Sequence, residues 1–503
     1  MTLKIIFNQK ILIMLFIIAG SLFPQSSMEW MNQMALYEAV RLYEEEKENM
    51  NLTNNRTMLY ELEKEKYSFW DNALYTAWKA VDTIVDWATA TNWYKLGLSY
   101  YEKGQYEEAI NSFKKAVEEK PNKYLNWQLL GRSYYDNEQY KEAINSFKKA
   151  VELKPNDAYN WLWLGRSYYL NRQYKEAINS FKKAVELKPN NDMNWYRLGR
   201  SYYDNGQYKE AINSFKKAVE LTPNDAYNWL WLGRSYYLNR QYKEAINPLK
   251  KAVELKPNND MNWYRLGRSY YDNEQYKEAI NSFKKAVELK PNDAYNWLWL
   301  GLSYFFNEQY KEAINSLKKA VELNPNEYLN WQWLGFSYTG NEQYKEAINS
   351  LKKAVELKPN DAYNWQLLGF SYTGNEQYKE AINSLKKAVE LNPNDAYNWY
   401  YLGRSYIGNE QYKEAINSLK KAVELNPNDA NNWYWLGRSY NKNGEYEEAA
   451  KSLKKAAELK PNDAYNWLWL GHSYFFNKQY KEAINSFKKA VELKPNDAYN
   501  WLW

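Results

Sequence analysis

The stretch that decides the fold is AYNWLWLGRSYYLNRQYKEAINSFKKAVELKPNN, residues 158–191. In its first half, residues recur at steps of three and four, the spacing of one helical stripe: Trp161, Leu164, Gly165 and Tyr168. Its second half carries a stripe of its own: Tyr174, Ala177, Ile178, Phe181, Ala184 and Val185. We therefore predict two helices in this stretch and name them the A helix and the B helix.

Punctuating residues separate the two predicted helices. Asn171-Arg172-Gln173 forms the turn between them, and Asn171 can adopt the left-handed conformation that such a turn needs. Pro189 stops the B helix, and Asp157 stands where it can cap the following A helix. The stretch thus predicts a complete helix-turn-helix module.

The same module recurs with a fixed period. Tryptophans are spaced by 34 residues along most of the chain: Trp93, Trp127, Trp161, Trp195, Trp229, Trp263, Trp297, Trp331, Trp365, Trp399, Trp433, Trp467 and Trp501. Twelve full repeats occupy residues 90–497, and a thirteenth begins at 498–503. We number repeat positions so that residue 158 is position 1. A period of this length is typical of a solenoid.

The repeat resembles the tetratricopeptide repeat family, because Trp, Leu, Gly, Tyr, Ala, Phe, Ala and Pro occupy the family's signature positions in nearly every copy. The resemblance covers about four fifths of the chain. It implies an all-α, right-handed superhelical solenoid of 34-residue helix-turn-helix repeats. One departure is Pro248, which replaces Ser inside a B helix and should cost about 3 kcal/mol or kink that helix.

The flanks of the repeat array have other signals. Lys4 and Lys10 precede an apolar run at residues 11–23, the layout of a secretory leader, so we expect a signal peptide at 1–27 and export to the periplasm, envelope or medium. The run is too short for a stable membrane span. Residues 28–89 are expected to form a helical cap over the first repeat. The incomplete thirteenth repeat suggests that the natural product is longer.

The composition argues against a catalytic or metal-binding site in this chain. It has no cysteine and one histidine, His472, and it lacks a glycine-rich phosphate loop and a Ser/His/Asp set. A catalytic or metal centre needs different groups converging from non-equivalent positions, which near-identical repeats do not offer. We therefore expect no enzyme activity, no cofactor and no metal. A formal charge of +6 is too small to predict a nucleic-acid partner.

One face of the predicted A helices is unusual. Positions 2, 5, 6, 9, 12 and 13 lie opposite the signature stripe at about 100° per residue, and we call them the inner face. This arc should be polar in a surface helix, yet it is rich in Tyr and Trp. The family resemblance implies that it lines a concave groove, and an aromatic wall in water predicts a partner. Packing of these rings between neighbouring A helices is the alternative.

Position 9 divides the groove into zones. Five consecutive arginines precede an apolar zone, and a second basic zone follows. The candidate ligand-binding residues are Arg132, Arg166, Arg200, Arg234, Arg268, Phe336, Phe370, Arg404, Arg438, His472, Tyr196 and Tyr264. Three of the arginines, Arg132, Arg200 and Arg268, have Asp four residues later and are expected to pair with it. The four others, Arg166, Arg234, Arg404 and Arg438, are the better ligand candidates.

These features lead to competing functions. The leading hypothesis is an exported scaffold that binds a protein or an extended peptide. The inner face also suits envelope glycans or acidic polymers, since Tyr, Trp and Arg bind sugars and polyanions. A third hypothesis is the adaptor arm of a longer enzyme. RNA recognition is disfavoured by the leader and the weak charge.

Overall fold

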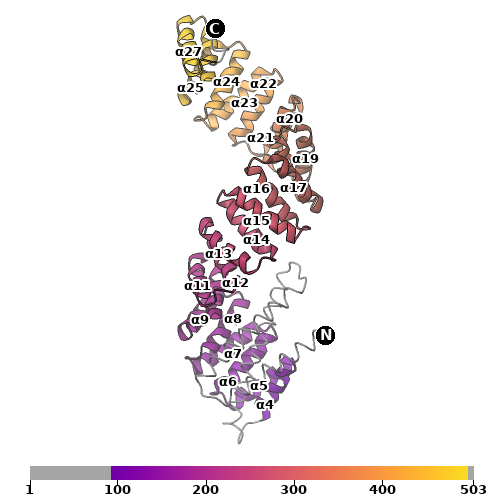
Figure 1. The fold of residues 1–503 in the computed structure, drawn as a ribbon, viewed down its shortest axis with the longest axis vertical. Helices are drawn as coiled ribbons and strands as arrows, with labels where there is room; N and C mark the ends of the chain where they lie inside the picture. The colour runs from indigo at the N-terminus through magenta and orange to yellow at the C-terminus, as the bar shows by residue number, and fades with distance from the viewer. Residues whose placement is uncertain (1–91, 497–503) are drawn as a thin grey trace. The chain divides into compact units, whose positions relative to one another are not determined.

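The structure is a computed structural model that describes residues 92–496, and all regular elements in that range are α-helices. Each repeat folds as two packed helices (Figure 1), so the predicted all-α architecture of helix pairs is confirmed. The expected signal peptide (1–27), the cap region (28–89) and the start of the thirteenth repeat (498–503) lie outside the described residues.

Helices of the two kinds alternate along the described range. The A helices are α4 (Asn92–Glu102), α6 (Tyr124–Asp136), α8 (Ala158–Leu170), α10 (Asp192–Asp204), α12 (Ala226–Leu238), α14 (Asp260–Asp272), α16 (Ala294–Phe306), α18 (Tyr328–Gly340), α20 (Ala362–Gly374), α22 (Ala396–Gly408), α24 (Ala430–Lys442) and α26 (Ala464–Phe476). The B helices are α5 (Tyr106–Glu119), α7 (Tyr140–Leu153), α9 (Tyr174–Leu187), α11 (Tyr208–Leu221), α13 (Tyr242–Leu255), α15 (Tyr276–Leu289), α17 (Tyr310–Leu323), α19 (Tyr344–Leu357), α21 (Tyr378–Leu391), α23 (Tyr412–Leu425), α25 (Tyr446–Leu459) and α27 (Tyr480–Leu493).

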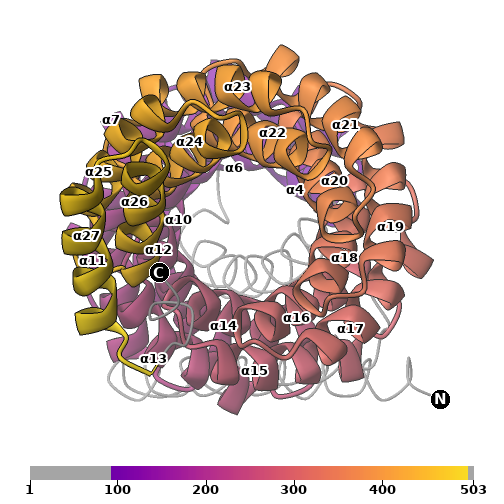
Figure 2. The same cartoon turned by 90° about the horizontal axis from the view of Figure 1, so that it is seen from above.

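The chain divides into two compact bodies, Met1–Asn171 and Arg172–Trp503. The described part of the N-terminal body holds α4 to α8, and that of the C-terminal body holds α9 to α27. Within the C-terminal body the A helices lie on the inner side of the coil and the B helices on its outer side (Figure 2). Residues of the A helices therefore form the inner wall of that body.

A close approach holds the A and B helices of one repeat together. A Cβ atom built on Gly131 would lie 3.0 Å from the Phe147 ring, and one on Gly335 would lie 2.5 Å from Cγ of Leu351. Phe147 and Leu351 are both completely buried. Glycine at position 8 is thus required because it lets the B helix insert a large side chain against the A-helix backbone.

The turn between the two helices differs from the prediction in one residue. Asn171 has φ −78° and ends the A helix, whereas Arg172 has φ +57° and takes the left-handed conformation. The prediction that the asparagine would be left-handed was therefore wrong. The physical reason is that the backbone N–H of Asn171 still donates to the carbonyl of Ser167 at 3.0 Å, so the helix extends to Asn171 and the chain reverses at the next residue. The following position bears the positive φ, and glycine occupies it at Gly206.

The junction between repeats is closed by two hydrogen bonds. The backbone N–H of Tyr159 donates to the Asp157 carboxylate at 2.9 Å, which confirms the predicted N-cap. The indole Nε1–H of Trp161 donates to the carbonyl of Pro155 at 2.7 Å. The same Trp-to-Pro bond recurs in each repeat from Trp127 to Trp467. Position 4 therefore ties each A helix to the end of the preceding B helix.

Pro248 lies inside α13, which nonetheless runs without interruption from Tyr242 to Leu255. In the equivalent helix α15, Ser282 donates its hydroxyl to the carbonyl of Glu278 at 2.9 Å. Proline has no N–H for the helix ladder and no hydroxyl for this bond. Packing in the array thus keeps α13 helical despite the lost hydrogen bonds.

We predict that Pro248→Ser raises the free energy of unfolding by up to about 3 kcal/mol, because it restores the backbone hydrogen bond and relieves the clash with the preceding turn. The measurement is urea denaturation of the full chain followed by circular dichroism. Ser282→Pro in α15 is the matched reverse change and should lower the midpoint. Unchanged midpoints in both variants would contradict this account of α13.

Candidate ligand-binding face

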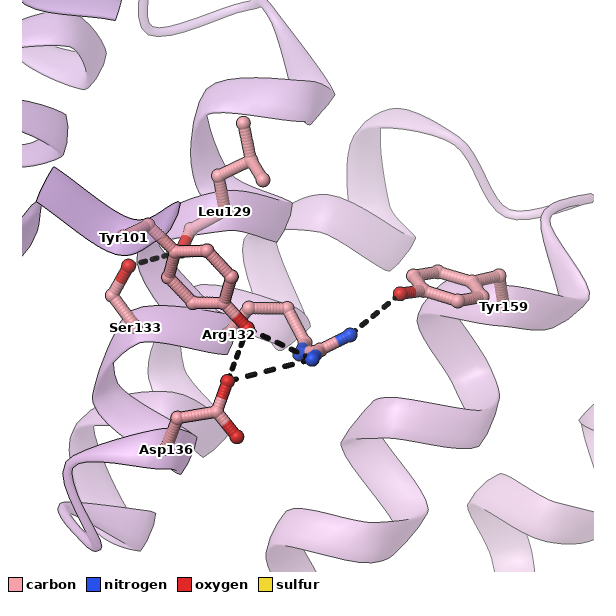
Figure 3. Close-up of polar contacts among 6 residues, drawn as sticks. All are labelled: Tyr101, Leu129, Arg132, Ser133, Asp136 and Tyr159. Atoms are coloured by element: carbon pink, nitrogen blue, oxygen red, sulfur yellow. Dashed lines mark hydrogen bonds and ion pairs between the residues drawn. The ribbon is translucent and has the colours of Figure 1, made fainter. Parts of the chain in front are cut away.

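Arg132 is held in a dense polar network (Figure 3). Its Nη1 donates to the hydroxyl of Tyr159 at 2.7 Å, and its Nη2 donates to the hydroxyl of Tyr101 at 2.8 Å. Asp136 lies 3.4 Å from Nη2 and accepts a hydrogen bond from Tyr101. Burial raises the pKa of Tyr101 well above its ordinary value, so the phenol keeps the proton that it donates. The network joins three consecutive A helices, α4, α6 and α8.

The predicted arginine-aspartate pairs are confirmed in all three repeats that carry them. The distances from the guanidinium to the carboxylate are 3.4 Å for Arg132–Asp136, 3.6 Å for Arg200–Asp204 and 3.5 Å for Arg268–Asp272. Position 12 of the preceding repeat takes part as well, since Arg268 donates to the hydroxyl of Tyr237 at 2.7 Å and Tyr237 donates to Asp272. These arginines are therefore neutralised within the protein.

The tryptophan at position 6 lies between two arginines of position 9. The guanidinium carbons of Arg132 and Arg166 each lie 3.7 Å from the centroid of the Trp163 ring. Trp163 is 1% exposed and also stacks on Phe147. The same arrangement recurs at Arg200–Trp231–Arg234 and at Arg404–Trp435–Arg438. Cation–π stacking of this kind fixes consecutive repeats against each other.

This stacking changes the interpretation of two predicted ligand contacts. Arg166 is 6% exposed and contacts Trp163 and Tyr135, so little of its surface is left for a ligand. Burial, together with the neighbouring Arg265 and Arg200, lowers the pKa of Arg234 to about 10. Both arginines pack within the inner face. The alternative interpretation, in which inner-face side chains pack between neighbouring A helices, therefore describes α8 and α12 well.

The two predicted tyrosine contacts support arginines of their own helices. Tyr196 is buried and accepts a hydrogen bond from Arg200 at 3.1 Å. Tyr264 is half-buried and accepts one from Arg268 at 3.3 Å. Each tyrosine also packs edge-on against a phenylalanine of its own B helix. These hydroxyls are engaged inside the wall.

The apolar zone follows in helices α16, α18 and α20. Leu302 is buried, whereas Phe336 and Phe370 are half-buried. The ring of Phe336 lies 4.8 Å from that of Phe305, and the ring of Phe370 lies 5.2 Å from that of Tyr401. Phe336 also lies 5.7 Å from the ring of Trp333. Both phenylalanines keep part of the ring exposed.

Arg404 and Arg438 lack the aspartate partner that Arg132, Arg200 and Arg268 have. Within residues 92–496, no carboxylate lies within 4.0 Å of either guanidinium, and their Nε atoms are buried without a hydrogen-bond acceptor, as are those of the three paired arginines. Arg438 stacks between Trp435 at 4.7 Å and Trp469 at 4.5 Å. Both side chains are half-buried. Two oriented positive charges therefore remain on this part of the inner face.

His472 continues the arginine row on α26. Its ring lies 5.2 Å from that of Trp469 and 6.4 Å from that of Phe476. Burial lowers the pKa of His472, so the fold favours the neutral imidazole. The histidine therefore replaces an arginine in the stack without adding a full charge at neutral pH.

A row of exposed tyrosines was not among the predicted site residues. Position 2 carries tyrosines that are 45–58% exposed in the C-terminal body: Tyr295, Tyr363, Tyr397 and Tyr465. They share a helical stripe with position 9, seven residues further on. The recurrence of Tyr at position 2 was the available signal, but the pattern did not reveal that these four tyrosines are exposed while Tyr159 and Tyr227 at the same position are half-buried.

Family models match the sequence along much of its length. The model described as anaphase-promoting complex, cyclosome, subunit 3 matches residues 66–150, 146–218, 215–286 and 340–422, which together span more than half of the chain. Models described as tetratricopeptide repeat or TPR repeat match residues 267–307, 294–327, 400–464 and 440–502. The chain belongs to the tetratricopeptide repeat family. No curated protein matches this tetratricopeptide repeat chain.

Several solved structures are similar to this tetratricopeptide repeat chain. The hetero-tetramer Cut9–Hcn1 of the APC/C is 16% identical, covers 83% of this chain and 96% of its own, and has a TM-score of 0.39. MamA from Desulfovibrio magneticus RS-1 is 28% identical, and the match covers 33% of this chain and 95% of the MamA chain with a TM-score of 0.32. YrrB, described as a TPR protein with an unusual peptide-binding site, is 26% identical. The match covers 37% of this chain and 96% of the YrrB chain, with a TM-score of 0.35.

Two further features are absent from residues 92–496. No group of three or more His, Asp or Glu side chains there could hold a metal ion. None of the helices in this range is both long enough and apolar enough to cross a membrane.

We predict that Arg132→Ala lowers the free energy of unfolding by about 2–4 kcal/mol, because it leaves the carboxylate of Asp136 buried without its counter-charge. Arg132→Ala combined with Asp136→Ala should be more stable than Arg132→Ala alone. Chemical denaturation of both variants measures the difference. If the double variant is the less stable of the two, the network is not held together by charge compensation.

Proposed function

We propose that the protein is an exported, non-catalytic scaffold that binds an extended peptide segment of a partner along the inner face of α16 to α26. The observation that carries this proposal is the combination of exposed tyrosines at position 2 with half-buried Phe336, Phe370, Arg404 and Arg438 at position 9. Both rows run along one stripe of consecutive A helices. They offer apolar contact, hydroxyl groups and positive charge on a single surface.

The spacing of the repeats supports an extended ligand. Packed helices lie about 8–10 Å apart, and an extended chain advances about 3.3 Å per residue. Consecutive A helices contact one another throughout the C-terminal body. One A helix therefore corresponds to about three residues of peptide, and the five steps from α16 to α26 could hold a segment of about fifteen residues.

Arginines that are already paired with aspartates limit the proposed binding surface to α16 to α26. In α6, α10 and α14 the arginines pair with aspartates of their own helices. The inner face of those helices therefore has fewer uncompensated charges for a ligand to bind. The apolar zone and the second basic zone are better suited to binding than the first basic zone.

Export remains part of the proposal and is supported by the sequence alone. Lys4, Lys10 and the apolar run at residues 11–23 have the layout of a cleaved leader. N-terminal sequencing of the mature protein tests it, and a start at residue 1 would contradict it.

The binding function is tested with an unbiased array of random twelve-residue peptides and a glycan array, probed with the same purified protein. We expect a subset of peptides to bind. Replacing the four tyrosines Tyr295, Tyr363, Tyr397 and Tyr465 by serine should weaken binding of that subset at least tenfold, about 1.4 kcal/mol or more.

The matched control replaces four exposed leucines at the ends of B helices, Leu221, Leu289, Leu357 and Leu425, by serine. This variant removes the same number of exposed apolar side chains away from the inner face and should retain peptide binding. Binding to glycans alone, or equal loss in both variants, would overturn the proposal of a peptide-binding inner face.

A further inference from the structure

The inner wall of α16 to α26 contains no acidic residue. The A helices α16, α18, α20, α22, α24 and α26 carry neither Asp nor Glu within their bounds. Their charged residues are Arg404, Arg438 and Lys442, with His472 as a further titratable group. In contrast, α6, α10 and α14 each place an aspartate one turn after the arginine. The helices α8 and α12 have no acidic residue within their bounds either. Internal aspartates therefore alternate along the first basic zone and are missing from both arginine-bearing helices of the second.

The position where the aspartate would stand is occupied by other residues. Position 13 is Gly408 after Arg404 and Lys442 after Arg438. A Cβ on Gly408 would lie 2.3 Å from the ring of Tyr378, so an aspartate there would require this ring to move. The internal counter-ion is therefore replaced by close helix packing on α22 and by a second cation on α24.

Stacking fixes how the two guanidiniums can bind. Trp435 lies 4.7 Å from both Arg404 and Arg438, and Trp469 covers Arg438 at 4.5 Å. Tyr400 and Tyr434 of the same helices hydrogen-bond to Arg404 and Arg438. Each guanidinium has five N–H donors, so others remain for a ligand. Burial raises the pKa of the adjacent Tyr400 and Tyr434, which keeps these phenols neutral and unable to cancel the charge. Oriented guanidinium edges of this kind match a carboxylate with two parallel hydrogen bonds.

We infer that the partner segment is an acidic peptide in which two apolar side chains are followed, at intervals of about three residues, by two carboxylates. The apolar side chains would lie against Phe336 and Phe370 on α18 and α20, and the carboxylates would pair with Arg404 and Arg438 on α22 and α24. This inference rests on the proposed function and adds the chemistry of the ligand and its register to it. An acidic polysaccharide offers the carboxylates but has no apolar side chains for the two phenylalanines.

The probe is the fluorescein-labelled peptide Phe-Gly-Ser-Phe-Gly-Ser-Glu-Gly-Ser-Glu, together with the version in reverse order, because the direction of the chain in the groove is open. Binding to the full chain is measured by fluorescence anisotropy at two salt concentrations. We expect one order to bind at least tenfold more tightly than its Glu→Gln version, and its affinity to fall as salt rises.

Variants of the protein locate the interaction. Arg404→Gln with Arg438→Gln should weaken binding of the acidic peptide by about 10- to 100-fold, because two charge-assisted contacts are lost. The matched control is Lys421→Gln with Lys455→Gln on the B helices α23 and α25, where each lysine pairs with a glutamate of its own helix. It removes the same net charge from the outer side and should change binding by less than about twofold.

The outcomes separate this inference from the proposed function. Equal binding of the Glu and Gln peptides, with loss in the variant of the four position-2 tyrosines, would overturn the acidic ligand and leave the peptide-binding face standing. If polyglutamate or heparin binds more tightly than the acidic peptide, the ligand is a polyanion. That result would overturn the inferred contacts of apolar side chains with Phe336 and Phe370. Failure of every designed peptide to bind overturns the inference, while the random array decides the proposed function independently.

Discussion

The arrangement of the wall depends on one contact, the insertion of a B-helix phenylalanine or leucine against an A-helix glycine sixteen residues earlier in the same repeat. Because the glycine has no side chain, the two helix backbones approach closely on that side of the A helix. The opposite side has few contacts with its own B helix, such as that of Tyr196 with Phe215. It must be satisfied by neighbouring A helices or by a ligand. The zoned inner face is a consequence of this asymmetry.

Neighbouring A helices satisfy much of that side with arginine and tryptophan. An indole between two guanidiniums buries apolar area and balances the ring quadrupole with positive charge, and it does so between repeats as well as within them. Arginine suits this position better than lysine, because its flat guanidinium can stack while its edges still donate hydrogen bonds. The side chains predicted to meet a ligand in α6 and α8 are therefore largely used to join repeats.

Sequence alone was sufficient for the helix pairs, their caps and the three arginine-aspartate pairs, since all of these depend on local spacing. Periodicity fixed the side of the helix on which Arg132 lies, but it could not show that Trp163 of the next A helix covers it. That contact depends on the separation and rotation of two helices, which a pattern within one helix does not encode. The turn was also predicted wrongly, since the left-handed conformation was placed at Asn171 and is adopted by Arg172, at the position where another repeat has Gly206. The recurrence of tyrosine at position 2 could be read from the sequence, but the exposure of these side chains could not.

The contrast between the two basic zones depends on few residues in each repeat. Arg268 and Arg404 occupy the same repeat position, and each lies against an indole of the following repeat. They differ at position 13, where Asp272 neutralises one guanidinium and Gly408 leaves the other without a counter-ion. Position 13 is at the end of the A helix and takes no part in the position-8 glycine contact that sets the fold, although a glycine there packs against the first tyrosine of the preceding B helix. The charge of the wall can therefore change from repeat to repeat with a local adjustment of that tyrosine and with the position-8 contact intact. This separation of the residues that build the solenoid from those that set its charge is why near-identical repeats can present a face with distinct zones.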